Sequence, residues 1–269
     1  MVGDKLIKIG IIGGTGVYDP NILENVRKIE TMTPYGRVCY KVGDFAGKSI
    51  AFIPRHGSKH SIAPHLINYR ANIWAMKKIG VCNILATAAV GSLHLPMQLG
   101  DFVLLDQFID FTKNRVMTFH EGGKRGVVHV DLSSPYCPSL RDKLLVASQN
   151  SGITVHSQGT YICTEGPRFE TPAEIIMFSK LGGHLVGMTN VPEVVLAREA
   201  EICYSAIAMV TNFAAGISKT PVTYGEVIEI MNQNTEKLKT LLMNTIKLID
   251  IEADCSCRHA LAEYGGFKI

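Results

Sequence analysis

An arginine and a histidine directly follow residues 50–53, a short apolar run that is typical of a buried strand. In open α/β sheets, ligands bind just beyond the ends of such strands. Arg55 can hold a phosphate through two parallel N–H bonds, and His56 can donate to the same anion. The pair also suits a surface arginine beside a turn histidine, so other groups must support a ligand site.

A more specific group lies between residues 165 and 174, Glu-Gly-Pro-Arg-Phe-Glu-Thr-Pro-Ala-Glu. Gly-Pro predicts a turn, Phe169 offers a ring face, and Glu170 precedes a helix that begins after Thr171. A ring beside a carboxylate suits a planar heterocycle, because the ring stacks on it and the carboxylate accepts from its N–H groups. The alternative is a core phenylalanine and a glutamate that compensates the helix dipole.

Two polar residues end further apolar runs. Thr189 lies just before a helix led by proline, where a hydroxyl can bind an anion, although a simple turn fits as well. Asn212 ends a buried strand, where its amide can contact a heteroatom edge. The glycines of residues 13–16 can present backbone N–H groups to an anion. Asp19 stands where a dinucleotide fingerprint needs its third glycine, so we do not predict a Rossmann site.

Two other patterns fall short of the motifs they resemble. Residues 43–49 have three residues between their glycines, where a P-loop needs four, so we predict a hairpin turn there. His56, His60 and His65 do not share one helix face and have no carboxylate or cysteine among them. We therefore expect no metal at these histidines.

The seven cysteines mostly lie inside apolar segments, as buried free thiols do in a cytoplasmic protein. Cys255 and Cys257 form the one tight pair, which supplies too few ligands for a zinc site. We therefore expect no metal cofactor. A disulfide between these two, or between Cys137 and Cys203, is left open by the sequence.

Alternating strand and helix patterns must position these residues. Strands are expected at 8–12, 38–42, 49–53, 83–90, 102–108, 153–157, 159–163 and 204–210, and helices at 64–80, 140–151, 172–182, 192–200 and 224–249. This alternation predicts one α/β domain with a largely buried sheet. Residues 112–136 form the longest loop, and such loops are often functional.

Composition excludes several classes of protein. Hydrophobic residues make up 46% and charged residues 19%, which excludes a disordered or coiled-coil chain. The net charge of +3 is too small to indicate nucleic-acid binding. No apolar run is long enough for a membrane span, and the first residues lack a signal-peptide pattern, so a cytoplasmic protein is expected.

Several of these segments together resemble the purine nucleoside phosphorylase and S-methyl-5′-thioadenosine phosphorylase family. The segments are 9–16, 54–57, 68–72, 89–93, 165–174 and 188–199, and the resemblance extends over about residues 8–248. It implies a single nucleoside phosphorylase-like α/β domain over 1–269, with a central, largely buried mixed sheet flanked by helices and a tail at 250–269. It also implies a homotrimer or hexamer that serves purine salvage, with inorganic phosphate as co-substrate and no other cofactor.

The resemblance assigns roles to residues of this chain. Phosphate would contact Thr15, Arg55, His56, Thr189 and the backbone of Ala88 and Ala89, where the family often has a phosphate-binding side chain in place of Ala88. The nucleoside would contact Met188 at its ribose, Phe169, Glu170, Asn212 and Ala214 at its base, and Tyr224, Ile228 and a neighbouring subunit's His129 at its 5′ end. Asn212, His56 and Glu170 would be the catalytic residues.

Asn212 and Glu170 also predict the base. Methylthioadenosine enzymes of the family usually have Asp and Ser or Thr at these places, whereas Asn and Glu are its 6-oxopurine pattern. Glu170 can accept the N1–H of hypoxanthine or guanine, but it faces a second acceptor in adenine, at a cost of about 2–4 kcal/mol. Because Asn212 could flip its amide, most of the discrimination is expected at Glu170.

The predicted reaction is therefore phosphorolysis of inosine, guanosine or 5′-methylthioinosine. The first alternative is S-methyl-5′-thioadenosine phosphorylase. A nucleosidase, which uses water, and a non-catalytic nucleoside-binding protein are two others, and dependence of the reaction on phosphate separates all of them.

Overall fold

Strand β1 (Ile9–Gly13) lies at the centre of one mixed sheet, parallel to β4 (Lys48–Pro54) on one side and to β5 (Asn83–Ser92) on the other. The computed structural model describes residues 7–14, 23–57, 60–218, 221 and 223–269. Within this part of the chain the sheet has 11 strands, in the order β2-β3-β4-β1-β5-β10-β9-β7, with β11, β6 and β8 branching from β5.

The remaining elements follow the predicted alternation. The other strands are β2 (Glu24–Thr33), β3 (Gly36–Phe45), β6 (Phe102–Leu104), β7 (Gln107–Phe111), β8 (Val155–His156), β9 (Thr160–Thr164), β10 (Leu185–Gly187) and β11 (Cys203–Phe213). The helices are α1 (Tyr69–Lys78), α2 (Pro138–Ser151), α3 (Pro172–Lys180), α4 (Asn190–Glu199) and α5 (Tyr224–Leu248). The expected α/β fold with a mixed sheet flanked by helices is confirmed.

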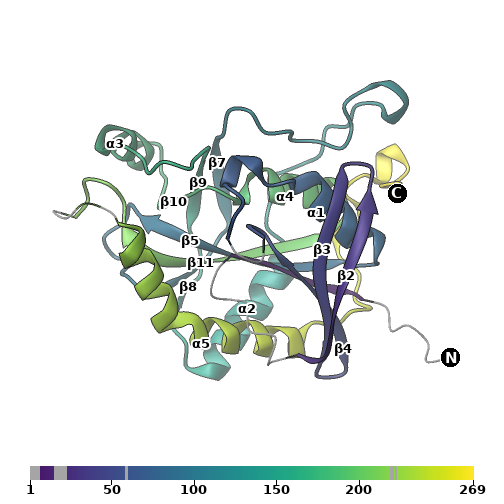
Figure 1. Ribbon diagram of the computed structural model, residues 1–269, viewed down its shortest axis with the longest axis horizontal. Coiled ribbons are helices and arrows are strands. Elements are labelled where there is room, and N and C mark those ends of the chain that lie inside the picture. The colour runs from purple at the N-terminus through teal and green to yellow at the C-terminus, as the bar shows by residue number, and fades with distance from the viewer. Residues whose placement is uncertain (1–6, 15–22, 58–59, 219–220, 222) are drawn as a thin grey trace.

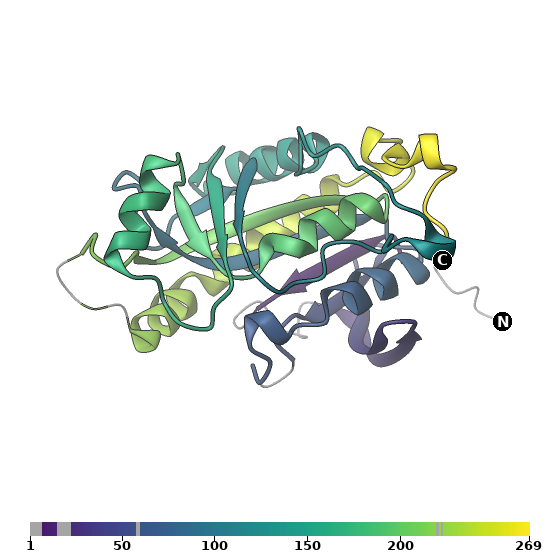
Figure 2. The ribbon, with the colours of Figure 1, turned by 90° about the horizontal axis from the view of Figure 1, so that it is seen from above.

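Both faces of the sheet are covered by helices, because successive side chains of the central strands point to opposite faces and are apolar on both. Ile9 and Ile11 point into a core shared with α2 and α5, whereas Ile12 and Ile53 point into a core shared with α1 and α4. Figure 1 shows these two helix pairs on opposite sides of the sheet. In Figure 2 helix α4 lies in front of the long strands, with α5 behind them.

The predicted hairpin is confirmed. Strands β3 and β4 pair in antiparallel register, and Ala46 and Gly47 between them have φ of 49° and 75°. Two consecutive left-handed residues are typical of a type I′ turn, whose twist matches that of the flanking strands. The glycines of residues 43–49 therefore serve a hairpin and not a phosphate loop.

Three element predictions need correction. The expected strand at 102–108 is two strands, β6 beside β11 and β7 beside β9, and the side chain of Asp106 between them accepts a bond from the Gly159 amide. The first helix begins at Tyr69 and not at residue 64. The Asn68 side chain caps its N-terminus. Strands β2 and β10 were missed, because most residues of β2 are exposed and show no apolar alternation and β10 has only three residues.

The C-terminal tail packs onto the domain. Both carboxylate oxygens of Glu201 accept backbone N–H bonds from it, those of Leu261 and Phe267, at 3.1 and 2.9 Å. The Phe267 ring contacts Trp74 of α1 edge to face. No helix in the described part of the chain is both long and apolar enough to cross a membrane.

Candidate active site

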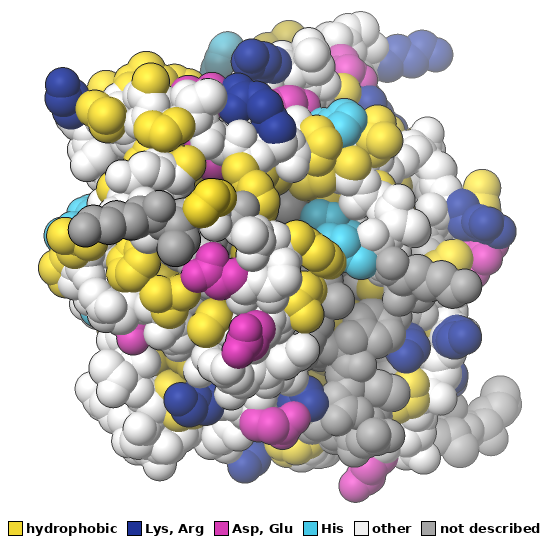
Figure 3. All heavy atoms as spheres, turned by 60° about the vertical axis from the view of Figure 1, so that its left-hand side comes forward, with side chains coloured by type: hydrophobic (Ala, Val, Ile, Leu, Met, Phe, Trp, Pro, Cys, Tyr) yellow, Lys and Arg dark blue, Asp and Glu magenta, His cyan; other side chains and the backbone are white. Residues whose placement is uncertain are grey.

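A cavity of about 480 Å³ lies beyond the ends of β1 and β4 and along the carboxyl halves of β5 and β11. Parallel strands end together at this edge, where α/β proteins bind ligands. Helix α5 and the turn before α3 form its outer wall. Figure 3 looks onto this end of the molecule, where hydrophobic and histidine side chains lie together.

Most of the predicted site residues line this one cavity. They are Arg55, His56, Ala88, Ala89, Phe169, Glu170, Met188, Thr189, Asn212, Ala214, Tyr224 and Ile228. Thr15 lies outside the described residues. His129 is exposed in the loop after β7, where its backbone N–H donates to the Tyr264 hydroxyl, and it does not line the cavity of its own chain. Its proposed contact with a neighbouring subunit stays a prediction.

Arg55 is held by a buried partner that the sequence did not indicate. Its Nε and Nη2 donate to the two carboxylate oxygens of Glu193 in α4, at 2.7 and 2.6 Å, and both side chains are buried. Burial opposes the charge on Arg55, but the Glu193 carboxylate raises its pKa above the ordinary value. Tyr204 donates to the same carboxylate at 2.8 Å.

This pairing limits what Arg55 can offer an anion. Nη1 also donates to the Thr87 carbonyl at 2.8 Å, and Nη2 to that of Ile12 at 3.3 Å. Among the described residues, four of the five guanidinium N–H groups are therefore used, and one on Nη1 has no partner. The two-bond grip that the sequence indicated is not available, so Arg55 can offer a phosphate one N–H bond and its charge.

His56 is neutral in this environment. Burial lowers its pKa to about 4. Its Nδ1 lies 2.9 Å from the carbonyl of Ile62, which can only accept, so Nδ1 carries the proton and Nε2 is left with a lone pair. His56 can therefore accept a hydrogen bond from a protonated phosphate, where the sequence had indicated a donor.

Glu170 is oriented by Thr164, a residue at the end of β9 that the sequence analysis did not single out. The Thr164 hydroxyl donates to Oε1 of Glu170 at 2.7 Å, which leaves Oε2 for a ligand. Burial raises the pKa of Glu170, and no described cation forms an ion pair with it. Arg168, two residues away, instead binds Glu174 through two bonds of 2.8 and 2.7 Å.

Asn212 has a fixed amide orientation. Its Nδ2 donates to the Phe213 carbonyl at 2.9 Å, and its Oδ1 accepts from the Thr211 hydroxyl at 3.0 Å. Flipping the amide would place Oδ1 against the Phe213 carbonyl, which disfavours the flip that the sequence left open. A Cβ on Gly91 would lie 3.1 Å from this Nδ2, so glycine leaves room for the amide.

The wall formed by α5 is largely apolar. Tyr224, Val227, Ile228 and Met231 face the cavity from the first two turns of the helix, which the Thr223 hydroxyl caps through the Glu226 amide. Opposite them, Ala88 and Ala89 of β5 carry no side-chain polar atom. At these two alanines only backbone groups can bind an anion, as the sequence indicated.

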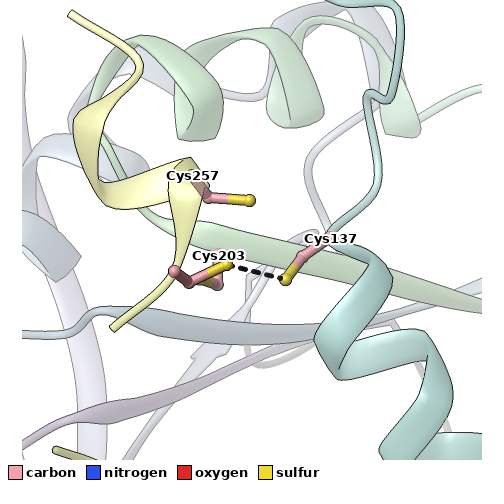
Figure 4. A group of neighbouring side chains, drawn as sticks. Cys137, Cys203 and Cys257 are labelled. Carbon is pink, nitrogen blue, oxygen red and sulfur yellow. Dashed lines mark hydrogen bonds between the residues drawn. The ribbon is translucent and has the colours of Figure 1, made fainter. Parts of the chain in front are cut away.

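Four cysteines form a second cluster, and none of them lines this cavity. The sulfur atoms of Cys137, Cys203, Cys255 and Cys257 all lie within 4.8 Å of one another, and all four thiols are free. Figure 4 shows three of them, from the start of α2, the start of β11 and the tail. From the sequence, only the two tail cysteines were considered as zinc ligands, whereas Cys137 and Cys203 were considered as a possible disulfide. Together the four are the group among the described residues that could hold a metal such as zinc.

The fold and the cavity define an α/β protein that binds a small ligand where its parallel strands end. Residues 8–247 match the family described as the phosphorylase superfamily. The chain belongs to this superfamily, which confirms the resemblance found in the sequence.

Three similar proteins have named activities. A probable 6-oxopurine nucleoside phosphorylase of Dictyoglomus turgidum is 55% identical over 258 residues, 96% of this chain and 98% of the relative. An S-methyl-5′-thioadenosine phosphorylase of Thermofilum pendens is 49% identical over 259 residues, 96% and 98% of the two chains. Methylthioadenosine phosphorylase of Schistosoma mansoni in complex with adenine has a TM-score of 0.90 at 35% identity, covering 96% of each chain.

Proposed function

We propose that this protein catalyses the phosphorolysis of 6-oxopurine nucleosides to the free base and a ribose 1-phosphate. The observation that carries the proposal is the pair of oriented base contacts. Thr164 fixes the Glu170 carboxylate as an acceptor for N1–H, and Phe213 fixes the Asn212 amide with one N–H available for N7 or O6. Relatives of 50–56% identity named as 6-oxopurine nucleoside phosphorylases support it.

The reaction follows from the chemistry of the lining residues. A phosphate oxygen attacks C1′ while the bond from C1′ to N9 breaks, and the electron pair goes to the purine. A hydrogen bond donated by the Asn212 amide stabilises the negative charge that develops on the base. The proton of monohydrogen phosphate ends on the released purine, so charge and atoms balance. Arg55, Thr189 and the backbone of β5 hold the phosphate, and His56 accepts from its hydroxyl.

The 5′ substituent separates two groups of substrates. The apolar side chains of α5 favour a methylthio group, which supports 5′-methylthioinosine beside inosine and guanosine. The tyrosine hydroxyl of Tyr224 can instead bind a 5′-hydroxyl. A relative named as a probable S-methyl-5′-thioinosine phosphorylase, 48% identical over 255 residues, supports the methylthio substrate.

S-Methyl-5′-thioadenosine phosphorolysis is the second candidate. A relative of that name at 49% identity favours it. The Glu170 carboxylate argues against it, because adenine N1 is an acceptor and burial leaves the mismatch without compensating water.

One substrate panel tests these proposals. Inosine, guanosine, 5′-methylthioinosine, adenosine and methylthioadenosine are each incubated with and without phosphate, and release of the base is measured. We expect phosphate-dependent cleavage of the 6-oxopurine nucleosides. Equal turnover without phosphate would indicate a nucleosidase, and binding without turnover a nucleoside-binding protein. Faster cleavage of methylthioadenosine would favour the second candidate.

We also propose a cytoplasmic trimer or hexamer that acts in purine salvage and needs no cofactor besides phosphate. Support comes from the loop at 112–136, which carries the exposed His129 away from the cavity of its own chain. Sedimentation of the purified protein tests the assembly, and a fully active monomer at assay concentration would refute it.

A further inference from the structure

Arg115 donates to four backbone carbonyls at the edge of the cavity. It lies in the loop after β7, and its side chain is 2% exposed. Nη1 donates to the carbonyls of Met188 and Val191 at 2.7 and 2.6 Å, and Nη2 to those of Thr164 and Glu165 at 3.1 and 2.8 Å. One planar guanidinium thus joins four carbonyls.

These carbonyls belong to two segments that form different parts of the site. Thr164 and Glu165 begin the turn that carries the base contacts Phe169 and Glu170. Met188 and the next residue, Thr189, follow β10, the strand that pairs with β9, and line the cavity where ribose and phosphate would bind. The two segments also touch, because a Cβ on Gly166 would lie 2.5 Å from the Met188 sulfur. Arg115 therefore fixes the separation between the base side and the phosphate side.

Charge pairing alone does not account for an arginine at this position. Its nearest described carboxylate is Glu165, 3.6 Å from Nε, and Nε makes no hydrogen bond within the described residues. A buried charge with incomplete pairing costs free energy, which the hydrogen bonds to the four carbonyls must offset. The Tyr69 hydroxyl, 3.2 Å from Nη1, is a further dipole and supplies no charge.

We propose that Arg115 is a positioning residue for phosphorolysis, which sets the distance and angle between the bound purine and the bound phosphate. The inference rests on the proposed function and extends it. Attack on C1′ requires the phosphate oxygen, C1′ and the leaving nitrogen to be aligned, and a displacement of about 1 Å can cost on the order of 100-fold in rate. A residue bonded to both segments controls that alignment although it touches neither substrate.

The test compares Arg115→Met and Arg115→Lys with the wild type. Methionine keeps the volume without hydrogen bonds, whereas lysine keeps the charge and up to three donors. We expect Arg115→Met to raise the KM for phosphate and the KM for the nucleoside together, and to lower kcat on the order of 100-fold. Arg115→Lys should recover part of each constant.

Arg198→Met is the matched control. Arg198 is another buried arginine, 9% exposed, that donates to a carbonyl of the same long loop, that of Ser134, and it does not line the cavity. We expect this variant to lose thermal stability without a change in either KM. All constants are expressed per folded molecule, with the folded fraction taken from circular dichroism.

Specific results would overturn the inference. Unchanged KM values in folded Arg115→Met, or a loss of kcat that only follows the folded fraction, would reduce Arg115 to a structural role. If Arg115→Met does not fold, unchanged constants in Arg115→Lys overturn it equally. A wild type without phosphate-dependent activity would remove the proposed function and this inference together, whereas an active wild type with unaffected variants removes this inference alone.

Discussion

In the proposed function, two hydrogen-bonded side chains decide the choice of base. Thr164 holds Glu170 so that it presents an acceptor, and the Phe213 carbonyl holds Asn212 so that it presents a donor. A 6-oxopurine offers the complementary N1–H donor and O6 acceptor, whereas a 6-aminopurine offers the reverse at both places. Since neither side chain can turn without losing a bond, both contribute to discrimination.

The first prediction concerns this pair. We expect kcat/KM for a 6-oxopurine nucleoside to exceed that for its adenine counterpart by roughly 100-fold or more, the effect of an unpaired buried polar group. Asn212→Asp should shift activity toward 6-aminopurines, and adding Glu170→Ser should shift it further. Steady-state kinetics on matched nucleosides measures the ratio. A ratio that stays constant in both variants would contradict the assignment.

The second prediction concerns the protonation of His56. Its pKa lies at about 4 in the folded protein, below the ordinary 6.5, because burial disfavours the charged ring. The unfolded chain therefore takes up a proton at a higher pH than the folded protein does. The stability contributed by neutral His56 is complete above pH 6.5 and is lost as the pH falls toward 4, by at most about 1.4 kcal/mol per pH unit.

His56→Asn isolates this effect, because asparagine can still donate to the Ile62 carbonyl but does not titrate. Urea unfolding at several pH values between 6.5 and 4 should give a flatter dependence in the variant than in the wild type. Other groups, Glu170 among them, titrate in both proteins and cancel in the comparison. Parallel curves would show that His56 does not carry the shift.

At the scale of elements, the Arg55–Glu193 pair joins β4 to α4 and, through the carbonyls of Ile12 and Thr87, to β1 and β5. The pair thus holds together the four elements that end at the cavity. Arg55 serves both the fold and the anion site, and the two roles can be separated by mutation.

The third prediction separates them. Arg55→Met should cost about 3–5 kcal/mol of stability, because it leaves Glu193 buried and unpaired. The double variant Arg55→Met/Glu193→Leu should recover much of that loss. Both variants should show a strongly raised KM for phosphate and nearly unchanged binding of the free base. Calorimetry and kinetics measure the two effects, and recovery of phosphate affinity in the double variant would disprove a role for Arg55 in binding phosphate.

At the scale of the whole molecule, the tail is attached beside the starts of α2 and β11. Its backbone binds Glu201, and its two cysteines lie against Cys137 and Cys203. The sulfur atoms of Cys137 and Cys255 are 3.7 Å apart, so small movements would bring pairs to bonding distance.

The fourth prediction is that oxidation of the reduced protein links these thiols. A disulfide within the cluster that closes a long loop should raise the melting temperature by roughly 5–10 °C over that of the reduced protein. Peptide mapping without reductant identifies the pairs. Cys255→Ser/Cys257→Ser should reduce the gain, whereas Cys39→Ser, outside the cluster, should not. Melting that responds to a chelator but not to a reductant would indicate a bound metal instead.

Much of the architecture was encoded locally. Apolar runs predicted the central strands, the Thr171 to Glu174 spacing predicted the capping box of α3, and the glycines at 43 and 47 predicted a hairpin. Such patterns succeed because each depends on the geometry of a few consecutive residues. The pattern of apolar residues did not predict β2, because neither face of this strand is consistently buried.

The sequence also supplied the residues of the cavity, through motifs at the ends of strands and at helix starts. Their types, a carboxylate beside a ring, an amide and an arginine, suited a planar heterocycle and an anion, and the family resemblance implied that the heterocycle is a purine. What the sequence could not supply was the set of partners that orient them. Glu193 lies 138 positions from Arg55, and the carbonyls held by Arg115 lie between 49 and 76 positions away.

Contacts over such separations are decided by the order of strands in the sheet, because strands distant in sequence become neighbours only when the chain folds. The tertiary structure therefore decided which N–H of Arg55 has no partner among the described residues, that neutral His56 accepts, and that a turn of the Asn212 amide would lose its bond to Phe213. It also brought four cysteines together where the sequence showed only one close pair. The sequence determined which groups are present at the site, and the packing of the sheet decided which of their atoms face a ligand.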